Sequence, residues 1–145
     1  MYKHILIATD GSELAGKAVA AGLELAGRLE AKVTAVTATE PWMAMMQGEP
    51  AALAFPIGDY EKAAAENARR VLSSVEEAAK TQGVACETVQ VNDFPAEAII
   101  ATAKAKGCDL IVMASHGRRG VARILLGSQA TTVLTQSPVP VLICR

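Results

Sequence analysis

The amino-acid sequence predicts an α/β protein: an open, doubly wound sheet of five parallel strands with helices on both faces. The main observation is that short apolar runs and helical apolar periods alternate along the whole chain, which gives five expected strands and four expected helices. The composition agrees, because 145 residues with 51% hydrophobic and 20% charged side chains can bury a sizeable core. We find neither an internal repeat nor a linker, so we expect a single domain over residues 1–145.

The first strand and the first helix are separated by a polar turn. Ile5–Ala8 is a continuous apolar run of the kind that forms strands buried on both faces, and it stops at Asp10-Gly11-Ser12. Ser12 suits the N-terminal cap of a helix because its hydroxyl can accept a backbone N–H of the first turn. The apolar positions expected for this helix recur at three- and four-residue steps: Leu14, Ala18, Gly22, Leu25 and Leu29.

The next strand and helix flank the one irregular segment of the sequence. We expect a strand over Lys32–Ala38 and an Ala- and Glu-rich helix from residue 59 or 60 to residue 82, closed by Gly83. Pro41–Gly58 lies between them and contains Trp42, three methionines, three prolines and two glycines. Segments of this length in compact domains are usually functional or mobile, so a flexible crossover and a lid over a ligand both remain open.

The remaining elements follow one another at short intervals. Val84–Val91 alternates in polarity, which favours a strand near a sheet edge. Pro95 suits the first turn of a helix that Gly107 closes. The last three expected elements are a strand at 110–114, a helix from 127 or 128 to before Pro138, and a strand at 139–144.

Composition and charge exclude two classes of partner. The net charge is −1 and aromatic residues make up 3%, so we expect no binding to nucleic acid. No apolar run approaches the roughly 18 residues of a membrane helix, so we expect no membrane association and a cytoplasmic location. Cys86, Cys108 and Cys144 are widely spaced, which predicts reduced packing thiols and no metal cluster. His4 is expected to be a surface or edge residue.

Candidate binding residues follow the first and the fourth strands. In open α/β sheets, ligands bind beyond the carboxyl ends of the strands, where the strand order reverses. If these two strands are neighbours, the loop Ala8–Ser12 meets the loop Ala114–Gly120, and Gly127-Ser128 starts a helix beside them. Glycines allow close backbone approach, and the amides at a helix start favour negative charge. The sequence therefore predicts a phosphate-binding cradle, to which three arginines would add positive potential: Arg118, Arg119 and Arg123.

A second phosphate motif competes with this cradle. Residues 11–18 spell GxxxxGK after a strand, as a P-loop does. The next residue is Ala18, which has no hydroxyl to hold magnesium, and Leu14 already belongs to the helical period. We therefore interpret the stretch as helix.

The same residues resemble the universal stress protein family. The resemblance rests on Asp10-Gly11-Ser12, Asp109–Gly117, Gly127-Ser128 and Pro138–Ile143, and it covers the entire chain in order and length. The ATP-binding branch of that family carries Gly, two residues, Gly, nine residues, and then Gly-Ser or Gly-Thr. Here the spacing is intact, with Gly117 as the second glycine and nine residues before Gly127-Ser128, but Ala114 replaces the first glycine.

This resemblance implies an adenine-nucleotide α-hydrolase-like fold with strand order 3-2-1-4-5, and a dimeric, ATP-binding regulatory module of the stress response. The ligand would be ATP, or ADP or AMP, with Mg²⁺ held through the nucleotide beside Asp10. Asp10 would also lie near the ribose, Val36 would contact the adenine, and the residues from 114–120 and 127–130 would surround the phosphates. The implied site residues are Ala8, Thr9, Asp10, Val36, Met113, Ala114, Ser115, His116, Gly117, Arg118, Arg119, Gly120, Gly127, Ser128, Gln129 and Ala130. A methyl group at position 114 is expected to weaken binding, and Gly127→Val to abolish it while leaving the fold intact.

Alternatives remain open for several of these residues. Asp10 could instead help to cap the first helix, and Ser128 could be an ordinary cap. His116 is either a general acid or base, or a surface ring that supplies a backbone amide. The rival functions are a nucleotide-independent interaction protein, which Ala114 favours, and a slow ATP hydrolase. We see no convincing hydrolytic apparatus, so at most weak hydrolysis is expected.

The last strand predicts an interaction between copies of the chain. Residues 139–143 carry no charge and would lie at a sheet edge, which invites pairing with another strand. The family resemblance implies antiparallel pairing of these strands across a two-fold axis, so we expect a homodimer through Val139, Val141 and Ile143. A regulatory protein partner, not identified by the sequence, would then respond to nucleotide occupancy through a surface such as Pro41–Gly58.

Overall fold

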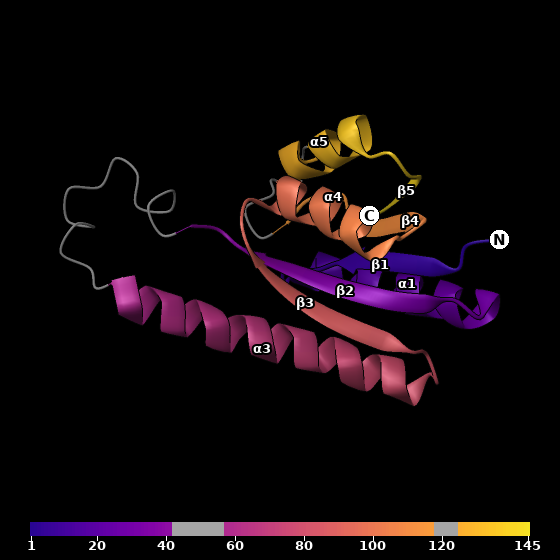
Figure 1. Cartoon of the computed structure of the whole chain (residues 1–145), viewed down its shortest axis with the longest axis horizontal. Helices are drawn as coiled ribbons and strands as arrows, with labels where there is room; N and C mark the ends of the chain where they lie inside the picture. Colours follow the sequence, from indigo (N-terminus) through magenta and orange to yellow (C-terminus); the bar gives the residue numbers. More distant parts are fainter. Residues whose placement is uncertain (42–56, 118–124) are drawn as a thin grey trace.

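The computed structural model describes residues 1–41, 57–117 and 125–145, and in these ranges five parallel strands form one sheet (Figure 1). The strand order β3-β2-β1-β4-β5 confirms the predicted order. All four neighbouring pairs are parallel, and Ile5 of the central strand pairs with Val33 on one side and Leu110 on the other. The strands are β1 His4–Ala8, β2 Lys32–Thr39, β3 Cys86–Asn92, β4 Leu110–Ala114 and β5 Val141–Cys144.

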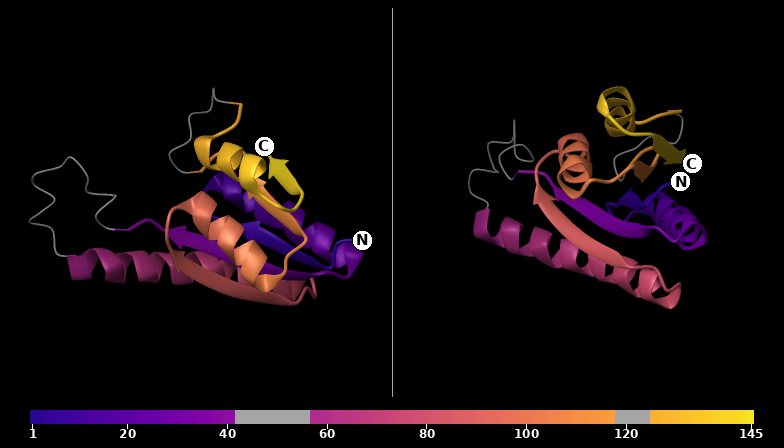
Figure 2. Two further views of the ribbon diagram at one scale, coloured as in Figure 1. Left: turned by 45° about the horizontal axis from the view of Figure 1, so that its top comes forward. Right: turned by 45° about the vertical axis from the view of Figure 1, so that its right-hand side comes forward.

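Helices cover both faces of the sheet (Figure 2), as predicted for a doubly wound fold. Side chains of α1 (Glu13–Leu29) and α3 (Ile57–Thr81) pack with Ile5, Ile7 and Val112 in one buried cluster. Side chains of α4 (Pro95–Lys106) and α5 (Ser128–Gln136) pack with Leu6 and Ile111 in the cluster on the other face. The two clusters use alternate residues of the same strands, because successive side chains of a strand point to opposite faces.

The start of α1 is fixed by the polar turn that follows β1. Ser12 is its N-terminal cap and accepts the backbone N–H of Ala15 at 3.3 Å, as predicted. The helix runs regularly through Gly16 and Lys17, so residues 11–18 do not form a P-loop. Its buried stripe differs from the predicted one, since Leu14, Leu25 and Leu29 only flank the core. The residues that are buried are Ala15, Ala18, Val19, Gly22, Leu23 and Ala26.

Three element boundaries differ from the prediction by two or three residues. Helix α3 begins at Ile57, inside the segment expected to be irregular; residues 42–56 of that segment lie outside the described residues. Strand β3 begins only at Cys86, because the N–H of Val84 donates to the carbonyl of Ala79 and so still belongs to the helix end. Strand β5 begins at Val141 rather than Val139, because the hydroxyl of Ser137 bonds both backbone groups of Val139 in a tight turn.

His4 is buried, which contradicts the expectation of a surface or edge residue. It retains 8% exposure on β1, and its Nε2 lies 2.7 Å from Oγ1 of the fully buried Thr34. Asp109, just before β4, accepts the backbone N–H groups of Lys3 and His4 at 2.8 and 3.1 Å and so ties the two strands together at their amino ends. Burial, assisted by the positive charge of Lys32, lowers the pKa of His4.

The helices of the described ranges are not long and apolar enough to cross a membrane. The three cysteines are unpaired, and Cys108 is buried.

Candidate functional site

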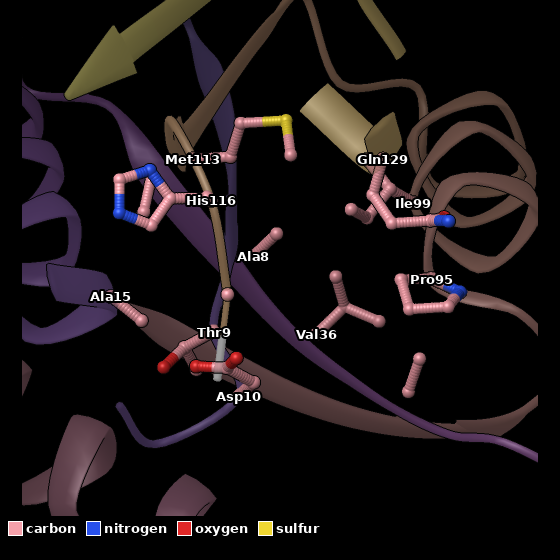
Figure 3. A pocket seen from close by; sticks show the side chains of 13 residues that line it. Ala8, Thr9, Asp10, Ala15, Val36, Pro95, Ile99, Met113, His116 and Gln129 are labelled. Carbon is pink, nitrogen blue, oxygen red and sulfur yellow. The ribbon is translucent and has the colours of Figure 1, made fainter. Parts of the chain in front are cut away.

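A pocket of about 600 Å³, counted with its open mouth, lies at the carboxyl end of the sheet. The pocket lies beside β1, where the strand order reverses: β2, the next strand in the chain, lies on one side of β1, and β4 lies on the other. Such a reversal of strand order leaves the following loops diverging to opposite faces, which opens a crevice between them. The pocket is lined by Ala8, Thr9, Asp10, Ala15, Val36, Ala38, Pro95, Ile99, Met113, Ala114, His116, Gly117 and Gln129 (Figure 3).

Nine of the residues singled out in the sequence line this pocket: Ala8, Thr9, Asp10, Val36, Met113, Ala114, His116, Gly117 and Gln129. Ser115 and Ala130 lie beneath the surface with 1% exposure each. Gly127 and Ser128 stand at the start of α5, outside the lining. Arg118, Arg119, Gly120 and Arg123 lie outside the described residues.

Sequence reasoning missed four residues of the lining: Ala15, Ala38, Pro95 and Ile99. Ala38 lies two residues beyond Val36 on β2, so the alternation of the strand places it on the same face and could have revealed it. Pro95 and Ile99 lie on α4, which starts after the carboxyl end of β3 and therefore at the same edge of the sheet. No motif marks them, because they contribute only apolar surface.

The loop after β1 meets the loop after β4 at Asp10 and Gly117. Asp10 Oδ1 accepts the backbone N–H of Ser12 at 2.9 Å, which orients the carboxylate and supports the start of α1. A Cβ atom at Gly117 would lie only 2.6 Å from Asp10 Oδ2, so the two loops touch where glycine leaves room. Asp10 therefore both braces the helix start, as the alternative interpretation expected, and faces the pocket.

Gly127 holds the start of α5 against the loop after β4. Its backbone N–H donates to the carbonyl of Ser115 at 2.7 Å, and a Cβ at this position would lie 3.0 Å from both that oxygen and Cβ of His116. Its amide is therefore used within the protein. The cap residue makes no side-chain hydrogen bond, and helix geometry leaves the first-turn amides of Ser128, Gln129 and Ala130 without intrahelical acceptors. These amides, rather than that of Gly127, are the donors that α5 offers an anion.

His116 is oriented by its neighbour. Nδ1 of its ring lies 3.1 Å from Oγ of the buried Ser115, within hydrogen-bonding distance, and His116 lines the pocket while Ser115 does not. Among the described lining residues Asp10 is the one carboxylate. The described part of the chain thus brings one carboxylate and one imidazole to the pocket, without a carboxylate pair.

Ala114 occupies its position without strain. It ends β4 and pairs with Cys144, and its 8% exposed side chain belongs to the buried cluster on the α1 face, with Leu110 and Val112. It is not among the residues with a positive φ. The methyl group therefore packs partly in the core, although Ala114 also contributes to the pocket lining.

The described residues contain no group of three or more His, Cys, Asp or Glu side chains that could hold a metal ion.

Comparison with known proteins agrees with this architecture. The sequence model of the universal stress protein family matches residues 1–145. The chain belongs to the universal stress protein family. Universal stress protein MJ0531 of Methanocaldococcus jannaschii is 32% identical over 145 residues, which cover 100% of this chain and 83% of that protein.

Solved structures of the family share the fold. Universal stress protein UspA from Lactobacillus plantarum superposes with a TM-score of 0.86 at 24% identity, covering 99% of this chain and 98% of that one. A universal stress protein solved in complex with cAMP superposes with a TM-score of 0.74 at 26% identity, covering 99% of this chain and 97% of that one.

Proposed function

We propose that this member of the universal stress protein family binds an adenine nucleotide, ATP or its products ADP and AMP, in the pocket at the carboxyl ends of β1 and β4. The observation that carries the proposal is that one pocket has an apolar wall and also reaches Gln129 in the first turn of α5, a helix whose cap residue, Gly127, has no side chain to accept from the first-turn amides. The solved relative in complex with cAMP supports it, because that protein is 26% identical and holds an adenine nucleotide.

The two ends of the pocket suit the two ends of a nucleotide. Val36, Ala38 and Ile99 form an apolar wall against which a flat base can pack. The amides of Ser128, Gln129 and Ala130 and the dipole of α5 favour the negative phosphates. Each dipole contact contributes about 0.3–1 kcal/mol at an exposed site, so several amides must act together.

Mg²⁺ would enter with the nucleotide rather than occupy a site of its own. The described residues form no cluster that could hold a metal ion, so phosphate oxygens would supply most of the ligands. Asp10 is the carboxylate that faces the pocket and is the residue we propose beside this ion. Its orientation by the Ser12 amide would keep that carboxylate in place.

The chemistry favours a regulatory module over an efficient enzyme. A nucleotide hydrolase needs a positioned base and charge stabilisation of the transferred phosphoryl group, and the described lining offers only Asp10 and His116. His116, oriented by Ser115, is the residue that slow hydrolysis would use, so loss of turnover in His116→Ala would favour that second function. Occupancy would then act as a signal to a protein partner in the cytoplasm, the reducing compartment that unpaired cysteines suit.

We also propose that the protein is a homodimer through β5. This strand is an edge of the described sheet, and Leu142 on it is 42% exposed. Val139, Val141 and Ile143 are partly buried against the α4–α5 core, so substituting them would damage the core as well as the edge. Leu142→Lys should therefore give a monomer mass by light scattering, whereas the control Ile57→Lys, at a side chain 49% exposed on α3, should leave the dimer intact. An unchanged mass for Leu142→Lys would contradict this dimer.

A pocket-filling substitution tests the nucleotide proposal. Ala38→Trp would place an indole ring against the apolar wall, where the base is proposed to lie, so ATP affinity should fall by about tenfold or more. The control Ala63→Trp adds the same ring at an exposed position of α3 and should bind ATP like the wild type. Equal affinities of the two variants by calorimetry would place any ATP site elsewhere.

A further inference from the structure

Gln129 connects the two helices that lie on the same face of the sheet. Its side-chain oxygen Oε1 accepts the backbone N–H of Ala96 at 2.9 Å, 33 positions away in the chain. Because a backbone N–H can only donate, the atom that faces Ala96 must be the amide oxygen. The hydrogen bond therefore fixes which end of this amide is which.

This contact gives α4 an acceptor for a first-turn backbone N–H, which the cap residue of that helix does not supply. Phe94 caps that helix without a side-chain hydrogen bond, and Pro95 at the first position has no N–H. Ala96 thus carries the first N–H donor of the helix, and Gln129 of α5 supplies its acceptor. The orientation of the Gln129 amide is set by α4 before any ligand binds.

The other end of the amide remains available to a ligand. Gln129 is an exposed residue of the pocket lining, and in the described part of the chain no protein acceptor is found for its Nε2, so a ligand would replace only water there. Figure 3 shows Gln129 on the same side of the pocket as Pro95 and Ile99, across from Thr9 and Asp10. That side is the apolar wall, which suits the base of a nucleotide better than its phosphates.

We propose that Gln129 is a specificity-determining residue whose Nε2 donates a hydrogen bond to an acceptor nitrogen of the bound purine, while its Oε1 stays on Ala96. This inference rests on the proposed nucleotide function and deepens it. The backbone N–H of Gln129 stays among the amides proposed for the phosphates, whereas its side chain, which reaches Ala96 at the start of α4, is assigned to the base end of the ligand. A hydrogen bond of this kind distinguishes bases by which ring positions carry an acceptor.

The test is a cycle of variants and nucleotide analogues. Wild type, Gln129→Met and the control Gln136→Met, on the last residue of the same helix, are titrated calorimetrically with ATP and with 1-deaza-, 3-deaza- and 7-deaza-ATP. Methionine keeps the length of glutamine but neither donates nor accepts strongly. Thermal unfolding of each variant measures the separate loss of the Ala96 cap.

We expect one of the three analogues to bind the wild type about three- to tenfold more weakly than ATP does, as the loss of one hydrogen bond predicts. Gln129→Met should bind ATP more weakly than the wild type does, by the same factor. Because the hydrogen bond is already lost in this variant, it should bind that analogue as well as it binds ATP. Gln136→Met should behave as the wild type. Gln129→Met could instead unfold at a lower temperature but keep the wild-type ratio of ATP affinity to the affinity for each analogue. That result would show that Gln129 only caps α4, and it would overturn the inference. Binding of ATP by the wild type with no effect of Gln129→Met would overturn it alone, whereas no ATP binding at all would overturn the proposed function as well.

Discussion

Glycine at position 127 should be required for the fold of the site loop as well as for ligand access. The Cβ of Gly127→Ala would lie 3.0 Å from the Ser115 carbonyl oxygen, 3.0 Å from His116 Cβ and 3.2 Å from His116 Cα. Those atoms are backbone or adjoin it, so they cannot move aside as a side-chain tip can. Alanine is also a poorer N-terminal cap than glycine, and we expect Gly127→Ala to lower the free energy of unfolding by about 1 kcal/mol.

Valine adds two methyl groups at the same crowded point. Overpacking of this kind costs about 1–3 kcal/mol beyond the loss of the cap, and moving the loop apart would also break the 2.7 Å hydrogen bond between Gly127 and Ser115. We therefore expect Gly127→Val to lower the free energy of unfolding by about 2–4 kcal/mol and to weaken ATP binding by displacing His116. The crowding at Gly127 therefore argues against the expectation that this variant leaves the fold intact.

Urea unfolding provides the assay, with Gly16→Ala as the matched control. A Cβ at Gly16, the fourth residue of α1, would meet no atom within 4 Å, so alanine there should stabilise the protein by about 0.5–1 kcal/mol through helix propensity. The two glycine substitutions should thus have effects of opposite sign. Unfolding of both Gly127→Val and Gly16→Ala at the wild-type urea concentration would show that a side chain at position 127 meets no crowding.

Three further predictions concern single residues. Ala114→Gly should leave ATP affinity within about twofold of the wild type by calorimetry, and should lower the free energy of unfolding by about 0.5–1 kcal/mol, because the methyl packs in the core of a regular strand. Burial lowers the pKa of His4 below 6.5, so the unfolded chain binds more protons just below that pH; stability should fall as pH drops from 7.5 to 5.5, and less steeply in His4→Gln, in urea titrations at each pH. Burial raises the pKa of Cys108 to about 11, so iodoacetamide at pH 8 should modify this thiol last in the native protein, and mass spectrometry showing it modified first would contradict its burial.

The periodicity of the sequence predicted the elements because burial dictates them. Ile5–Ala8 and Leu110–Ala114 are continuous apolar runs, and both became central strands buried on both faces. Boundaries that depend on a single side chain were missed, as at Val139, where the Ser137 hydroxyl bonds both backbone groups and the strand begins only at Val141. The burial of His4 was also missed, because it depends on Thr34 from another strand.

The candidate site could be predicted only where it has a local signature. The turn at Asp10 and the glycines after β4 carry such a signature, and Asp10 and Gly117 do meet at one pocket. The apolar wall from α4 carries none, since Pro95 and Ile99 are ordinary helix residues until the fold places them there. The hydrogen bond that the backbone N–H of Ala96 donates to Gln129 could not be predicted either, because it joins residues from two different helices.

Calorimetric titration of the nucleotide-stripped protein with ATP and magnesium measures directly whether the pocket binds a nucleotide. We expect one saturable site per chain with micromolar affinity, because the apolar wall and the amides at the start of α5 act on the same ligand. No heat of binding up to millimolar ATP would contradict it, and would leave the edge strand β5 as the functional surface to pursue.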